Sequence, residues 1–98
     1  MKANDNGNCL HGGGATGWLN QVYDITEKND SSVTFTINAK DGENSFPGNV
    51  TATAKYTVKS DNTLDIEFGA TTDKETVVNM TNHSYFNLNG DPSKEGFD

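Results

Sequence analysis

The stretch NVTATAKYTV, residues 49–58, alternates apolar and polar side chains along its length. The apolar side chains all fall on one parity and are Val50, Ala52, Ala54, Tyr56 and Val58. A period of two residues is typical of a β-strand that has one face on a core and the other in water. We therefore predict a half-buried antiparallel strand here.

The same period recurs on both sides of this stretch. VTFTINA (residues 33–39) and LDIEFGA (residues 64–70) each alternate, and they predict strands at Ser32–Ala39 and Leu64–Ala70. The polar segments Lys28–Ser31 and Lys59–Thr63 have the composition of turns between consecutive strands. This pattern predicts a meander of antiparallel strands.

Weaker alternation predicts a strand near Trp18–Glu27 and another over Thr76–Met80. His83–Leu88 is predicted as a further strand or as the continuation of Thr76–Met80 after a kink. No stretch combines helix caps with an apolar stripe of 3.6-residue period. We therefore expect an all-β fold that forms part of an antiparallel β-sandwich. The aromatic residues at strand positions are expected in its core; they are Trp18, Tyr23, Phe35, Tyr56 and Phe68.

The chain has 98 residues, enough for one small domain, and we treat residues 1–98 as a single partial domain. Only 32% of its residues are hydrophobic, which is low for a globular domain. A chain this short has little apolar surface to bury. We therefore expect part of the core to come from a second copy of the chain or from a further part of a longer protein.

The formal net charge is −7, and the seven basic residues are scattered along the chain. Because no basic patch could neutralise phosphates, we expect no nucleic-acid partner. No apolar run is long enough to cross a bilayer, so we expect no membrane association either. The single cysteine fits a reducing compartment, and we expect a cytoplasmic location.

Both histidines of the chain lie where the alternation breaks. His11 precedes three consecutive glycines, and His83 lies in TNHSYFNLNG (residues 81–90), which is rich in hydrogen-bonding side chains. A neutral imidazole in a cleft can act as a general acid near neutral pH. His11 could equally be an ordinary loop residue, and His83 a satisfied strand residue.

Tyr85 lies two residues after His83, so both side chains would share one face of a regular strand. A phenol ring beside an imidazole would suit the stacking of a sugar, with Phe86 and Leu88 turned to the core. Two histidines with no further ligand at metal-binding spacing make a poor zinc site, so we expect no metal.

Four motifs occur in an order that resembles the aldose 1-epimerase (galactose mutarotase) family. These are LHGG (Leu10–Gly13), FPGN (Phe46–Asn49), YTV (Tyr56–Val58) and ATTDKETVVNMTNHSYFNL (Ala70–Leu88). The resemblance covers about residues 8–90, and the chain resembles an internal fragment of the family. It implies the galactose mutarotase-like supersandwich, a large antiparallel β-sandwich with the sugar in an open cleft.

The resemblance also implies an activity, the interconversion of the α and β anomers of free aldoses such as galactose and glucose. A general acid protonates the ring oxygen while a general base removes the proton of the C1 hydroxyl, with no cofactor and no metal. His83 matches the family's general acid. His11 matches its second active-site histidine, which binds the substrate, and Tyr85 matches a position that lines the sugar pocket.

The family's catalytic base and its acidic sugar-binding residue belong to motifs that this sequence does not contain. Glu95 has none of the surroundings of the base motif. We therefore expect the isolated chain to be weakly active or inactive as an isomerase. Two alternatives stay open: a non-catalytic carbohydrate-binding β-module, and a chain that forms homo-oligomers through exposed strand edges.

Overall fold

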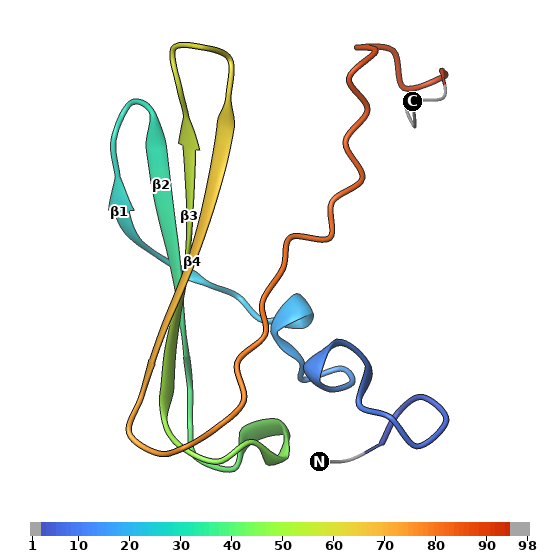
Figure 1. Cartoon of the computed structure of the whole chain (residues 1–98), viewed down its shortest axis with the longest axis vertical. Coiled ribbons are helices and arrows are strands. Elements are labelled where there is room, and N and C mark those ends of the chain that lie inside the picture. Colours follow the sequence, from blue (N-terminus) through green and yellow to red (C-terminus); the bar gives the residue numbers. More distant parts are fainter. Residues whose placement is uncertain (1–2, 95–98) are drawn as a thin grey trace.

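The computed structural model describes residues 3–94, which form one twisted antiparallel sheet flanked by irregular segments (Figure 1). The strands within this part are β1 (Asp24–Lys28), β2 (Ser32–Ala39), β3 (Val50–Val58) and β4 (Leu64–Thr72). Short 3₁₀ turns are η1 (Leu10–Gly12), η2 (Trp18–Asn20) and η3 (Glu43–Ser45). Among the described residues, no helix is long and apolar enough to cross a membrane.

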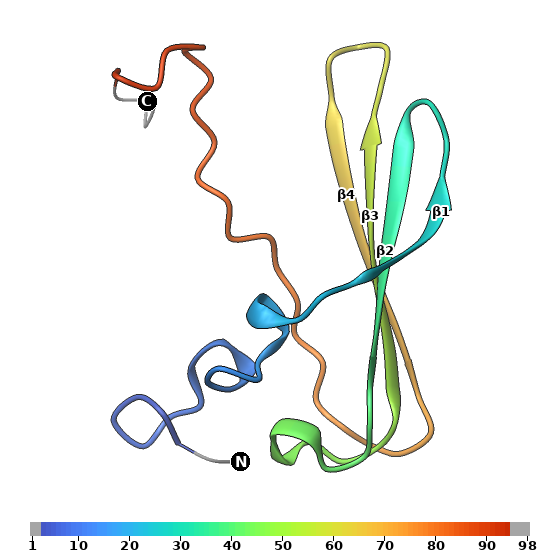
Figure 2. The same ribbon diagram turned by 180° about the vertical axis from the view of Figure 1, so that it is seen from behind.

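The strands follow one another in the sheet in the order β1-β2-β3-β4, and every pairing is antiparallel. The register of β2, β3 and β4 is continuous, whereas the β1–β2 pairing slips between Ile25 and Glu27. Figure 2 shows from behind how strongly the sheet twists along its long strands. The predicted meander and the predicted bounds of β2 are confirmed, and β4 extends two residues beyond the predicted Ala70.

The buried core is small and lies at the centre of the sheet. Its buried apolar side chains in the described part are Ile37, Val50, Ala52 and Ala54. Trp18, Tyr23, Ala39 and Met80 pack against it and stay partly exposed. The prediction that the strand aromatics form the core is therefore only partly right, because Phe68 is exposed and the other four are half-buried. One sheet layer covers only one side of each large ring.

The strand predicted near Trp18–Glu27 is wrong in its first half. Residues 18–20 form the 3₁₀ turn η2, and β1 begins only at Asp24. Leu19 and Val22 are exposed on this connection. Since the side chains of Leu19 and Val22 have no surface to pack against, the weak alternation does not lead to strand pairing.

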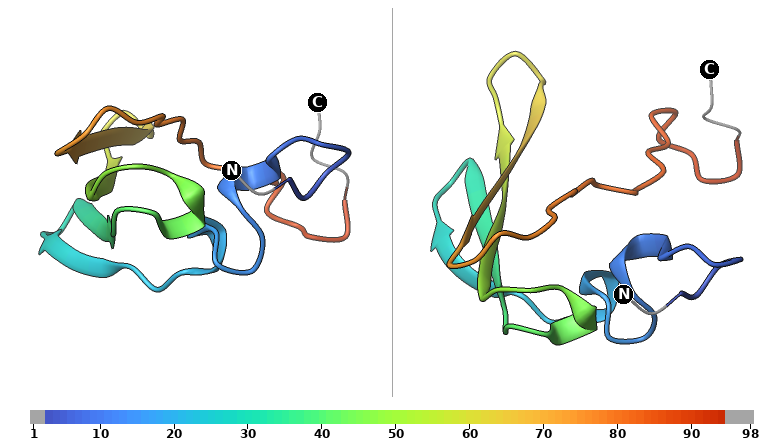
Figure 3. Two further views of the ribbon diagram at one scale, coloured as in Figure 1. Left: turned by 90° about the horizontal axis from the view of Figure 1, so that it is seen from below. Right: turned by 60° about the horizontal axis from the view of Figure 1, so that its bottom comes forward.

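The strands predicted over Thr76–Met80 and His83–Leu88 are also wrong. Both segments are irregular and pair with no strand of residues 3–94, and the last part of the described chain runs away from the sheet (Figures 1 and 3). Phe86 is 55% exposed and Leu88 is 90% exposed, so the expectation that both face the core is wrong as well. A strand exists only where backbone groups find a partner.

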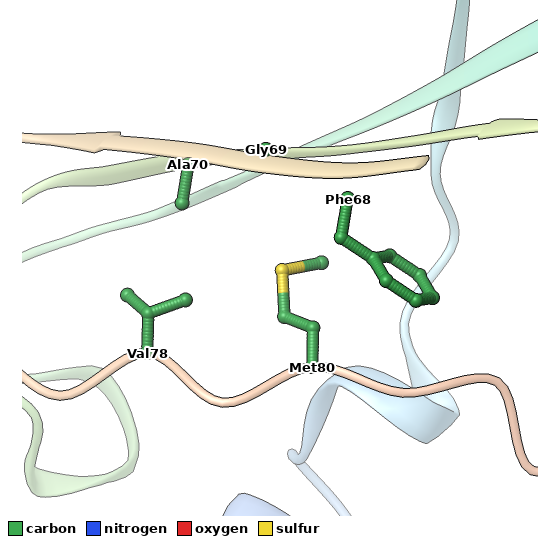
Figure 4. Close-up of a pocket in the computed structure, with 5 residues that line it drawn as sticks. All are labelled: Phe68, Gly69, Ala70, Val78 and Met80. Atoms are coloured by element: carbon green, nitrogen blue, oxygen red, sulfur yellow. The ribbon is translucent and has the colours of Figure 1, made fainter. Parts of the chain in front are cut away.

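Residues 78–80 instead lie across the apolar face of β4. Val78 and Met80 face Phe68 and Ala70 over a shallow groove of about 140 Å³ (Figure 4). The groove is lined by apolar side chains together with Gly69, and it contains neither histidine. Met80, which packs against the core, comes three residues before His83 in the chain.

Candidate active site

The glycine-rich loop bends sharply at His11. His11 has a φ of 56° inside η1, in the left-handed region that non-glycine residues seldom occupy. The turn is closed by the Gly13 amide, which donates to the Leu10 carbonyl at 3.3 Å. Four other non-glycine residues also have positive φ, namely Asn6, Asn44, Ser45 and Asn62, so this conformation marks a sharp turn at His11 and does not by itself assign it a function.

The loop is fixed to the β2–β3 connection through Asn44 of η3. The Thr16 hydroxyl donates to Asn44 Oδ1 at 2.7 Å, and Asn44 Nδ2 donates to the Thr16 carbonyl at 3.0 Å. Gly13 passes so close that a Cβ there would lie 2.9 Å from Asn44 Oδ1. With its φ of 145°, this position therefore requires glycine.

The segment that carries His83 is held to the sheet by Asn82. Asn82 Nδ2 donates to the Tyr56 hydroxyl of β3 at 3.0 Å, and Asn82 Oδ1 accepts from the Ser84 amide at 2.8 Å. The second contact closes a turn of the kind that asparagine forms with the amide two residues on. The Asn82 side chain thus joins the residue before His83 to β3 and also bonds to the residue after His83.

The rings of His11, His83 and Tyr85 form a continuous edge-to-face cluster. The centroids of the two imidazoles are 5.7 Å apart with an interplanar angle of 73°. The His83 and Tyr85 centroids are 5.4 Å apart at 63°. The structure therefore brings together the three residues that the sequence singles out, although their roles stay predictions.

The ring cluster is open to solvent, since His11 and His83 are exposed and Tyr85 is 84% exposed. Two imidazoles and a phenol can donate and accept hydrogen bonds and offer an apolar ring face. Within residues 3–94, no ion pair or hydrogen bond joins a carboxylate to either imidazole. The same residues contain no group of three or more potential metal ligands. In the part of the chain that the structure describes, the cluster thus contains groups able to exchange a proton but no carboxylate bonded to them.

Four residues that support the site were not identified from the sequence: Asn82, Tyr56, Asn44 and Thr16. Only Asn82 carried a usable signal, because an asparagine two residues before a serine in a polar stretch is typical of a side chain-to-backbone turn. The alternation in residues 49–58 predicts that the Tyr56 ring lies on the core face, but it does not predict the partner of the Tyr56 hydroxyl. Asn44 and Thr16 are 28 positions apart, and no local pattern links them.

Comparison with known proteins shows one family of relatives. The family model described as aldose 1-epimerase matches residues 1–97. The chain is 45% identical over 86 residues to the aldose 1-epimerase of Escherichia coli (strain K12), covering 88% of this chain and 25% of that protein. It is 34% identical over 98 residues to the galactose mutarotase of Bos taurus, covering 100% of this chain and 28% of that protein.

A solved structure shares the fold. The crystal structure of a GalM/aldose epimerase homologue from C. elegans matches with a TM-score of 0.82 and 33% sequence identity. The match covers 93% of this chain and 28% of that chain. The chain thus spans about a quarter of the length of the curated relatives it matches.

Proposed function

The chain belongs to the aldose 1-epimerase family, and from this premise we propose that His11, His83 and Tyr85 form the proton-donating side of an aldose-binding site. The observation that carries the proposal is the contact of two exposed imidazoles from distant segments, 5.7 Å apart. A neighbouring exposed phenol completes one ring surface.

In the proposed reaction, protonated His83 gives its proton to the ring oxygen of the sugar. A base takes the proton of the C1 hydroxyl, the bond between C1 and the ring oxygen breaks, and an open-chain aldehyde forms. Rotation about the C1–C2 bond followed by ring closure gives the other anomer. His11 would hydrogen-bond the substrate and Tyr85 would pack against its apolar face.

The open cluster limits both binding and rate. A hexose on an exposed surface buries little area, so we propose weak binding, with a Kd of about a millimolar or higher. General acid or base catalysis each contributes about 10² to 10⁴ in rate. With no carboxylate in contact with the cluster in residues 3–94, we propose that this chain exchanges anomers at least about a hundredfold more slowly than the E. coli relative.

Polarimetry with freshly dissolved α-galactose and α-glucose tests the catalytic part of the proposal. We expect a mutarotation rate close to that of water, against rapid exchange by the E. coli relative. A rate within about tenfold of that relative would contradict the expected deficit in catalysis.

Hexose titration followed by NMR tests the binding part. We expect shifts of the His11, His83 and Tyr85 ring signals on adding galactose. Tyr85→Ala should weaken binding about tenfold or less, because an aromatic contact contributes about 0.5–1.5 kcal/mol. Leu88→Ala is the matched control, since Leu88 is equally exposed on the same segment and outside the ring contacts. Equal effects of both substitutions, or unshifted ring signals, would contradict the proposed site.

A further inference from the structure

Asn82 links the candidate acid His83 to the sheet by a hydrogen bond to a single hydroxyl group. We propose that Asn82 is a positioning residue for His83, which it holds against His11 through the Tyr56 hydroxyl. The inference deepens the proposed function and rests on it for the role of His83. The geometry it invokes can be measured without any sugar.

The anchoring hydroxyl lies on a rigid part of the sheet. Tyr56 lies on the interior strand β3, with its backbone paired to Val33 of β2 on one side and Ile66 of β4 on the other. Its ring is half-buried and meets Phe35 edge to face, with centroids 6.0 Å apart. A tyrosine fixed at both backbone and ring gives its hydroxyl a defined position.

The segment that carries His83 has few other attachments. Residues 81–88 form no strand, and within residues 3–94 the Asn82–Tyr56 bond is their one hydrogen bond to the sheet. The nearest apolar anchor is Met80, two residues earlier, against Phe68 of β4. Without Asn82, residues 81–88 would lose that one hydrogen bond to the sheet, and the apolar contact of Met80 would be the attachment next to them within the described residues.

The amide of Asn82 can be oriented in only one way. Its oxygen faces the Ser84 N–H, which can only donate, so its Nδ2 group must point to the Tyr56 oxygen. Both ends of the amide are then used. The amide therefore fixes both the local turn around His83 and its distance from β3.

Tyr56→Phe is the most conservative test, because it removes one oxygen and keeps the ring in the Phe35 contact. A neutral hydrogen bond is worth about 1 kcal/mol, so the population with His83 docked should fall about fivefold relative to the undocked one. We expect weaker NOEs between the His11 and His83 rings and His83 shifts closer to those of a free peptide. Tyr23→Phe is the matched control, since it deletes the same group from another half-buried tyrosine.

Two substitutions at residue 82 distinguish an effect on the position of His83 from an effect on the stability of the whole fold. Asn82→Ala removes both contacts and should undock His83 at least as far as Tyr56→Phe. Asn82→Asp keeps an acceptor for the Ser84 amide and reverses the other bond, because the Tyr56 hydroxyl can donate to the new carboxylate. We expect Asn82→Asp to retain the ring NOEs, because both contacts of residue 82 are kept.

The outcomes distinguish this inference from the proposed function. Unchanged ring NOEs in both Tyr56→Phe and Asn82→Ala, with native β3 amide signals, would overturn the positioning role. Loss of the NOEs in these variants but not in Tyr23→Phe would support it, even if the wild-type chain binds no hexose. If the wild-type chain does bind galactose, its Kd should rise about fivefold in Tyr56→Phe, and an unchanged Kd would count against positioning.

Discussion

Two glycines in the β2–β3 connection share a backbone angle but differ in their surroundings. Gly42 and Gly48 both have a φ of 87°. A Cβ on Gly42 would meet nothing within 4 Å, whereas one on Gly48 would lie 2.7 Å from Thr72 Oγ1. Alanine substitutions at these two positions therefore separate two contributions to the free energy of unfolding. One is the strain of a left-handed alanine, and the other is the steric crowding of its Cβ.

We predict that Gly42→Ala lowers the free energy of unfolding by about 1 kcal/mol, the strain of an alanine in left-handed conformation. Gly48→Ala should lower it by about 2–4 kcal/mol, because the crowding at Thr72 adds to the same strain. Urea unfolding followed by circular dichroism measures both values. Equal losses in the two variants would show that the contact with Thr72 relaxes freely.

At the scale of single residues, the sequence singles out the three rings of the candidate site but not the residues that hold them in place. His11, His83 and Tyr85 were identified by motif resemblance, and their rings do meet in the structure. Periodicity could not have predicted this contact, because the two histidines are 72 positions apart and lie outside any strand (83 − 11 = 72). The Asn82–Tyr56 bond was missed since strand parity assigns a face to a side chain but no partner to its polar atom.

At the scale of elements, a small polar network joins the β2–β3 connection to the chain just after β4. Asp41 pairs with Lys74 at 2.9 Å and accepts from the Gly48 amide at 2.6 Å. Asp73 accepts from both the side chain and the backbone amide of Asn49, at 2.7 and 2.8 Å. The network closes the end of the sheet from which residues 76–83 depart.

These contacts shift the pKa values of the groups concerned. The bond to Lys74, followed by that to Gly48, holds the pKa of Asp41 below its usual 3.8. The side-chain and backbone bonds from Asn49 lower the pKa of Asp73 in the same way. The bond to Asp41 raises the pKa of Lys74 above 10.5. All three groups lie at the surface, so salt screens their interactions.

The signs of these shifts predict a loss of stability at both extremes of pH. A carboxylate with a lowered folded-state pKa stabilises the fold above its unfolded-state pKa, and this contribution is lost as the pH falls below about 4. The raised pKa of Lys74 contributes stability that is lost only as the pH rises above about 10.5. Between these limits we expect the melting temperature to change little through these groups.

Asp73→Asn tests the acid limb of this prediction. The variant should be less stable than wild type at neutral pH, and the difference should shrink as the pH falls below about 4 because wild-type Asp73 then becomes protonated. Melting temperatures measured across acid pH give the result. Asp30→Asn is the control, since Asp30 is exposed in a turn and its side chain forms no hydrogen bond or ion pair within the described residues. Parallel curves for wild type and Asp73→Asn would contradict the assignment.

The elements themselves were predictable wherever alternation coincided with pairing. β2 and β3 agree with their predicted bounds because their apolar parity matches across the ladder, as in the Ile37–Ala52 and Phe35–Ala54 pairs. Residues 76–88 alternate as well, yet they form no strand. Alternation indicates that a segment, if extended, would have one apolar and one polar face. To form a strand, the segment also needs a neighbouring strand with free backbone N–H and C=O groups.

At the scale of the whole molecule, the fold is open. Its radius of gyration is 16.2 Å, whereas a compact domain of this length has about 13 Å. Exposed large apolar side chains include Ile25, Phe68 and Val77. The sheet therefore resembles one layer of a sandwich, which fits a chain that matches about a quarter of the length of its relatives.

The two edges of the sheet differ in how well they are protected. β1 has five residues and an irregular register near Glu27, features that discourage further pairing. β4 has nine residues in continuous register and contains no proline. Among the described strands, the outer edge of β4 is therefore the more open template for another chain.

We predict that the chain self-associates through β4 at about micromolar to millimolar concentration. The net charge of −7 opposes association, so added salt should strengthen it by screening the repulsion between chains. Ala70→Lys places a charge on the apolar face of the edge strand and should shift the population toward monomer. Thr51→Lys is the control, because Thr51 lies on the polar face of the interior strand β3. Sedimentation velocity over this concentration range measures the outcome, and a single species of 10.6 kDa throughout, at low and high salt, would refute the prediction.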